Sequence, residues 1–243
     1  MLGGVLVEYP LSLSDRCKKS VRPGDNPNPL GRSDTVPLTP TIVDYGVGNL
    51  RSVQRAFQRI GVETEIGDSV NAVLAARALV LPGVGAFRNA IERLRQTGLD
   101  ETVCRAAGQG TPLLGICLGM QLLAGTSEEA GIHAGLGLIE GEVVPLLEET
   151  GLPLPHMGWN EVRPRENAAL FHDVPAQSDF YFVHAYHFVC ANEEDVQATC
   201  TYGQEFSCAV RSDKVMGVQF HPEKSQKFGR AVLENFMRIA EET

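Results

Sequence analysis

The sequence predicts an α/β fold of three layers, αβα, with a mixed, mostly parallel central sheet and an antiparallel addition near the C-terminus. Short apolar runs alternate with helical periodicity between residues 41 and 116, a pattern typical of a parallel sheet covered on both faces. After residue 180, apolar strands follow one another with few helices between them. That change predicts the antiparallel part.

The first half divides into strands and helices at its glycines. Residues 41–45 form an apolar run closed by Gly46-Val47-Gly48, and Leu50, Val53, Phe57 and Ile60 then recur at helical spacing until Gly61. Further strands are expected at 62–66, 78–81 and 112–116, with helical patterns up to about residue 108. The strands expected in the second half are 180–189, 196–202, 206–210 and 215–220. An amphipathic helix over about 225–240 follows, and packs back through Val232, Leu233, Phe236 and Ile239.

Residues 1–40 differ from the rest. They contain six of the 14 prolines, and residues 22–29 show no apolar period. Such a segment buries too little surface to offset the entropy of ordering it. We expect residues 1–40 to be a loose, disordered arm or the product of a start site placed too far upstream, and residues 41–243 to form the enzyme domain.

Composition narrows the function classes. The net charge of −9 disfavours nucleic acid as a partner, and the apolar runs are far shorter than the roughly 18 residues of a membrane span. Six cysteines lie without a CxxC pair, and no secretory signal is visible. We therefore expect a cytoplasmic protein with neither a metal site nor a cofactor.

The strongest local motif is Gly115-Ile116-Cys117-Leu118-Gly119. It lies between a buried strand and an apolar segment, Met120 to Ala124, with the pattern of a nucleophile elbow, in which a sharp turn connects a strand to a helix. A thiol at the amino end of a helix is favoured as thiolate by the free N–H groups there. Cys117 is therefore the candidate nucleophile, although a core cysteine in a glycine-rich turn would give the same pentapeptide.

A second motif, His221-Pro222-Glu223, ends the strand 215–220. Residues i and i+2 of an extended segment point the same way, so Glu223 can orient the imidazole of His221. A histidine held in this way can take a proton from a thiol and deliver one to a leaving group. Alone the tripeptide is weak evidence for a catalytic histidine, since a turn with a surface glutamate is equally compatible with it.

The third motif, Pro82-Gly83-Val84-Gly85, also ends a predicted strand and can expose backbone N–H groups for an oxyanion hole. Each of the three motifs ends a strand. Because sites in open α/β sheets lie outside the carboxyl ends of the strands, we expect the three to converge.

With these motifs the chain resembles the class I (triad) glutamine amidotransferases. Further segments resemble the glutaminase subunits of imidazole glycerol phosphate synthases from histidine biosynthesis. These segments are 43–50, 155–160, 181–184 and 217–225.

The resemblance implies a flavodoxin-like topology and a role for each matched residue. It implies Cys117 as nucleophile, His221 as base and acid, and Glu223 as the orienting carboxylate. Further roles fall to the N–H groups of Val84 and Leu118 (oxyanion), to Gly85, Gln121, His184, Ala185 and Tyr186 (glutamine binding), and to Trp159, Tyr181 and Lys224 (interface).

The implied partner is a (β/α)8-barrel cyclase in a heterodimer. The cyclase would receive ammonia through a tunnel and make imidazole glycerol phosphate and an aminoimidazole carboxamide ribotide. Two features depart from the family pattern: Ala185 stands where a serine is expected, and the 40-residue arm has no counterpart.

Other readings remain. A glutaminase that stands alone or serves another pathway shares all three motifs. A cysteine-type α/β-hydrolase would place its acid before the histidine, whereas Glu223 follows His221. A silent relative that binds a partner without catalysis would not need the complete triad. Outside the motifs, we expect His184 and His187 to be structural or interface groups in an apolar strand, and His133, His156 and His172 to lie in loops.

Overall fold

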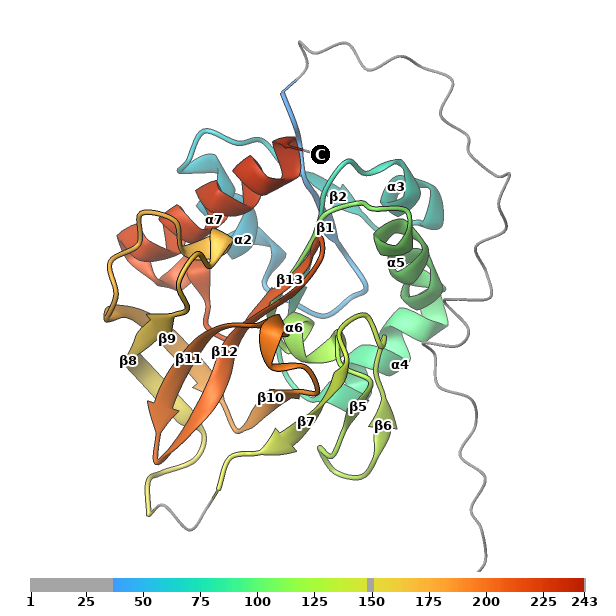
Figure 1. The fold of residues 1–243 in the computed structure, drawn as a ribbon. Helices are drawn as coiled ribbons and strands as arrows, with labels where there is room; N and C mark the ends of the chain where they lie inside the picture. The colour runs from blue at the N-terminus through green and yellow to red at the C-terminus, as the bar shows by residue number, and fades with distance from the viewer. Residues whose placement is uncertain (1–36, 148–150, 243) are drawn as a thin grey trace, which may run out of the picture.

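The computed structural model describes residues 37–147 and 151–242 (Figure 1). Its central sheet has the strand order β2-β1-β3-β4-β13-β12-β10-β7-β5-β6. The first five of these strands are parallel, and β12 begins the antiparallel part. This confirms the predicted α/β fold and the antiparallel addition. The expectations for residues 1–36 lie outside the described residues.

The parallel half contains β1 (Thr41–Val43), β2 (Glu65–Gly67), β3 (Leu79–Gly83), β4 (Leu113–Cys117) and β13 (Val215–Val218). The rest of the sheet contains β5 (Thr126–Ser127), β6 (His133–Ala134), β7 (Gly141–Pro145), β8 (His156–Pro164), β9 (Ser178–His184), β10 (Tyr186–Cys190), β11 (Val196–Tyr202) and β12 (Gln204–Ser212). The helices are α2 (Leu50–Gln58), α3 (Val70–Ala75), α4 (Phe87–Thr97), α5 (Leu99–Gly108), α6 (Leu118–Leu122) and α7 (Gln226–Glu241). Short 3-10 turns are η2 (Ala169–Phe171), η3 (Glu193–Asp195) and η4 (Pro222–Lys224).

The central parallel strands β1, β3, β4 and β13 bury both faces, as the sequence predicted. Along β3, Leu79 and Leu81 pack in one hydrophobic cluster while Val80 packs in the other. One cluster holds the apolar faces of α2 and α7, and the other holds those of α3, α4 and α5, on opposite sides of the sheet (Figure 1). This period-two alternation is what makes three layers, because successive side chains of a strand point to opposite faces.

Several predicted elements differ from the structure. The strand expected at 62–66 is shorter and later, because Val62 N donates to Phe57 O and so still closes α2. The helical region ending near 108 is two helices, separated at Gly98, whose φ of 70° ends α4. The strand expected at 180–189 is divided at Ala185: β9 pairs with β8, whereas β10 pairs with β7 and β12.

Some elements were not predicted at all, including α3, β7 and β8. As a result, two of the histidines expected in loops lie in strands: His133 in β6 and His156 at the start of β8. Within residues 37–147 and 151–242, no helix is both long enough and apolar enough to cross a bilayer.

Candidate active site

Cys117 ends β4 in a strained turn. Its φ of 55° and ψ of −111° are unusual for a residue with a side chain, and such a conformation costs about 1–3 kcal/mol. The turn is tight: a Cβ at Gly119 would overlap the carbonyl of Leu81, and one at Gly115 would lie 2.7 Å from the carbonyl oxygen of Gly119. The strand, turn and helix of the predicted elbow are therefore present, with α6 starting at Leu118 and only five residues long.

His221 and Glu223 lie three and five residues after the end of β13, the neighbour of β4. Nδ1 of His221 lies 2.8 Å from Oε1 of Glu223, and both side chains are only 3% exposed. Ser225 Oγ donates to the His221 carbonyl oxygen, and His221 N donates to the Tyr181 carbonyl. The carboxylate therefore lies where it can orient the ring, and the backbone around the ring is held from both sides.

Cys117 and Glu223 both affect the pKa of the His221 imidazole. Burial lowers the pKa of His221, but Cys117 and Glu223 raise it by more, to about 9. Nε2 of His221 is buried and makes no hydrogen bond with any described residue. The ring nitrogen that a general base needs is thus left for the thiol or for substrate, while Glu223 occupies the other nitrogen.

The glycine loop, residues 83–85, begins beside Cys117. Gly83 pairs with Cys117 across β3 and β4, and Val84, the predicted oxyanion donor, is 42% exposed just beyond. The Tyr45 hydroxyl donates to the Pro82 carbonyl oxygen at 2.8 Å, which ties the loop to β1.

A small hollow of about 10 Å³ lies between this loop, α2 and the pair His221 and Glu223, room for about one water molecule. Its described lining does not include Cys117, and Gly85 in the loop has a φ of 87°.

Four of the residues expected to bind glutamine lie close to one another. Gln121 on α6 is buried, and its Nε2 donates to the carbonyl oxygen of Tyr186 at 2.9 Å. His184 ends β9, Tyr186 begins β10, and Ala185 between them accepts a hydrogen bond from Leu146 N. The structure therefore brings Gln121 to the 184–186 segment, as the resemblance implies.

The three residues expected at an interface form one group next to the triad. Trp159 and Tyr181 pair across β8 and β9 with ring centroids 6.0 Å apart, and Lys224 Nζ lies 5.2 Å from the Tyr181 ring centroid. Trp159 is 49% exposed, and the Tyr181 ring lies 6.4 Å from that of His221. A protein bound on this group would therefore lie close to His221.

Sequence reasoning missed several polar groups of the site. Gln219 is fully buried, donates from Nε2 to Cys117 Sγ at 3.9 Å and accepts from Gln121. Its signal was present: Gln219 precedes His221 by two residues in the segment expected as the strand 215–220, a spacing that in a strand points both side chains the same way. Tyr45 was missed as well; burial and the nearby Cys117 raise the pKa of its hydroxyl.

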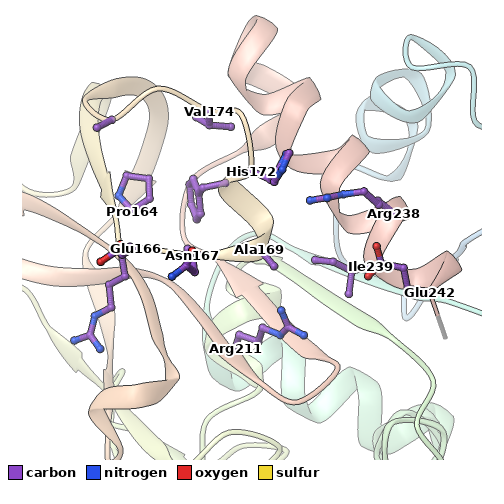
Figure 2. Close-up of a pocket in the computed structure, with 14 residues that line it drawn as sticks. Pro164, Glu166, Asn167, Ala169, His172, Val174, Arg211, Arg238, Ile239 and Glu242 are labelled. Carbon is purple, nitrogen blue, oxygen red and sulfur yellow. The ribbon is translucent and has the colours of Figure 1, made fainter.

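A larger hollow of about 760 Å³ lies elsewhere, between the loop after β8 and the C-terminal end of α7 (Figure 2). Arg165, Arg211 and Arg238 line it together with Glu166 and Glu242, and Arg165 already pairs with Glu193 at 2.9 Å. Its described lining includes no residue of the triad or the glycine loop. Size alone would therefore have pointed to the wrong place for the chemistry.

Comparison with known proteins agrees with this geometry. Residues 41–240 match the family described as glutamine amidotransferase class-I. The chain belongs to the class-I glutamine amidotransferases. The match covers every residue of the candidate site of this amidotransferase and begins at β1.

Two of the most similar relatives carry the same protein name, which is narrower than the family description. The imidazole glycerol phosphate synthase subunit HisH of Moorella thermoacetica is 50% identical over 195 residues, covering 80% of this amidotransferase and 92% of the relative. The subunit of the same name from Salinibacter ruber is 46% identical over 204 residues, covering 82% and 94%.

Solved structures share the fold of this amidotransferase at low identity. A crystal structure described as a glutamine amidotransferase superposes with a TM-score of 0.65 at 21% identity, covering 82% of this chain and 98% of that one. The structure of PurLQS from Thermotoga maritima gives 0.65 at 18% identity, covering 84% and 99%. At these identities the likeness concerns the fold alone.

Proposed function

We propose that this amidotransferase is the glutaminase subunit of an imidazole glycerol phosphate synthase. It hydrolyses L-glutamine to glutamate and ammonia, with Cys117 attacking the side-chain amide. The observation that carries the proposal is the convergence of Cys117, His221 and Glu223 from two adjacent strand ends. The names of the relatives support the choice of synthase.

The proposed chemistry follows from the geometry. His221 takes the thiol proton and later gives a proton to the departing ammonia, while Glu223 holds the ring. The N–H groups of Leu118 and of Val84 would stabilise the negative oxygen of the tetrahedral intermediate, once the loop has opened. Water then hydrolyses the thioester and releases glutamate.

The proposed partner is a cyclase subunit, a (β/α)8 barrel, that binds over Trp159, Tyr181 and Lys224 in a heterodimer. It receives the ammonia through an internal channel and makes imidazole glycerol phosphate and an aminoimidazole carboxamide ribotide in the cytoplasm. The position of these three residues beside His221 supports this arrangement, because ammonia leaving the site would emerge under the bound partner.

The isolated chain is expected to be a poor glutaminase that the cyclase activates on the order of 100-fold. The reason is the loop Gly83-Val84-Gly85, whose glycines allow the backbone to turn and bring the N–H of Val84 to the oxyanion when the cyclase binds. Glutamate release is measured with and without the purified cyclase subunit of the same organism.

Trp159→Ala provides a matched variant, expected to weaken cyclase binding while leaving the slow activity of the isolated chain unchanged. Full activity of the rigorously purified single chain would contradict the proposal and favour a standalone glutaminase. Turnover of esters without glutamine hydrolysis would favour the α/β-hydrolase, and turnover of neither would favour a silent binding protein.

We also propose that residues 1–36 are dispensable for the enzyme domain. Leu38 and Pro40 are buried, and the Pro40 carbonyl accepts a hydrogen bond from Glu65 N, so a truncation should stop before residue 37. A chain starting at Pro37 is expected to keep its thermal midpoint and its cyclase-activated glutaminase rate. Insoluble or inactive truncated protein would show that the removed segment contributes to the fold or the site.

A further inference from the structure

A buried pair of histidines connects β8 to the glutamine site. His156 and His184 face each other across β8 and β9, and Nδ1 of His156 lies 2.9 Å from Nε2 of His184. Nδ1 of His184 lies 2.8 Å from the Tyr186 carbonyl oxygen. At the other end, Asn160 Nδ2 lies 3.2 Å from Nε2 of His156 and donates to the Thr201 carbonyl at 2.9 Å.

The acceptors fix the direction of every bond in this series. The Tyr186 carbonyl can only accept, so Nδ1 of His184 carries the proton and its Nε2 must accept. His156 therefore donates from Nδ1 and accepts from Asn160 at Nε2. Burial supports the neutral rings that this pattern needs, since it lowers the pKa of His156 to about 4 and that of His184 to about 3.

The series continues to the nucleophile. The Tyr186 carbonyl also accepts from Gln121, so its two lone pairs are held by His184 and Gln121. The second amide proton of Gln121 goes to Gln219 Oε1 at 3.0 Å, and Gln219 in turn donates to Cys117 Sγ. Buried polar groups thus run from β8 to the sulfur without interruption.

The same stretch of β8 faces outward to the proposed partner. Met157 and Trp159 are 62% and 49% exposed, whereas His156 and Asn160 alternate with them on the inner face. A protein bound on the outer face would press on the strand that anchors the histidine pair.

We propose that His156 and His184 are positioning residues for glutamine hydrolysis. They fix the Tyr186 carbonyl and, through it, the amide of Gln121 beside Cys117. In this way the outward face of β8 is coupled to the glutamine site. The inference rests on the proposed function.

The test replaces each histidine by phenylalanine, which keeps the ring packing against Phe182 but removes both hydrogen bonds. In the cyclase complex, His156→Phe and His184→Phe are each expected to lower kcat/KM for glutamine at least about tenfold, mainly through KM, because small displacements of positioning groups cost up to about 100-fold. The double variant is expected to lose no more kcat/KM than the more impaired of the two single variants, because the two rings act as one unit.

His187→Phe is the matched control. His187 is also buried in this region and also packs near Phe206, but it lies in β10 and bonds to Gln204. The hydrogen bonds traced above through the described residues do not pass through it. His187→Phe is expected to shift the thermal midpoint about as much as the other two variants but to change kcat/KM by less than about twofold. That difference separates positioning from packing.

A second measurement does not depend on how the variants fold. Nitrogen-15 spectra of the parent chain labelled at histidine are expected to show both rings as neutral Nδ1–H tautomers at pH 7. An Nε2–H tautomer or an imidazolium at either ring would overturn the proposal, as would folded single variants with kcat/KM within twofold of the parent. A parent complex that releases no glutamate would instead refute the proposed function, which keeps the two failures distinguishable.

Discussion

Cys117→Ala is expected to reduce the turnover of glutamine by about a million-fold in the cyclase complex, the usual cost of removing the nucleophile of a catalytic triad. Without the sulfur no thioester forms, and the remaining groups only polarise the amide. The free energy of unfolding should change by only about 1 kcal/mol, because alanine keeps the Cβ and removes one buried atom. Glutamate release and urea unfolding measure the two quantities.

Two controls give this experiment its meaning. Cys104→Ala removes another buried thiol, which lies on α5 in the other hydrophobic cluster, and is expected to leave turnover within about twofold of the parent. The Cys117→Ala complex supplied with ammonium salt should still make the cyclase products, since the cyclase itself is intact. Near-parental glutaminase activity in Cys117→Ala would refute the assignment of the nucleophile.

The meeting of the three motif segments could be predicted because each of them follows a parallel strand. The register places Gly83 opposite Cys117 and Val218 opposite Ile116, so the loop, the elbow and the histidine segment emerge side by side. Local sequence fixes these strand ends, through glycines at the turns and Pro222 after His221. Adjacent parallel strands then bring together residues about 100 positions apart without any further information.

The buried polar groups behind Cys117, which are His156, His184 and Gln219, could not be predicted in the same way. His156 meets His184 only through the β8 and β9 register, and Gln219 meets Cys117 across 102 positions. Residues 156–160 contain a glycine and polar groups that resemble a loop, and tertiary pairing overrides that local preference. The division of the strand at Ala185 has the same origin, because the two halves find different partner strands.

The pair His221 and Glu223 of the candidate triad is already formed in the isolated chain, with Nδ1 and Oε1 2.8 Å apart. The Tyr45 hydroxyl bound to the Pro82 carbonyl is one contact that keeps the loop in place. Control of this site is therefore expected to act on the loop and on its oxyanion donor Val84 rather than on assembly of the candidate triad.

Glu223→Gln is expected to lower kcat by about ten-thousand-fold, as loss of the carboxylate does in other triads. Glutamine keeps the size of the side chain, so the loss reports the charge and the tautomer of His221 rather than packing. Glutamate release by the cyclase complex measures it. Glu234→Gln, which removes an exposed carboxylate from the same region of chain on α7, is the matched control and should leave kcat unchanged.

The same substitution should change how stability depends on pH. In the parent, the pKa of His221 rises from 6.5 to about 9 on folding, so its protonation stabilises the fold fully below pH 6.5 and progressively less up to pH 9. Glu223 is one of the causes of that rise, so Glu223→Gln lowers the folded pKa and shrinks the loss of unfolding free energy between pH 6.5 and 9. Urea unfolding at these two pH values measures the difference. If the change in unfolding free energy between the two pH values and kcat both stayed as in the parent, the carboxylate would neither raise the pKa of the ring nor orient it. The short contact to Nδ1 would then be only structural.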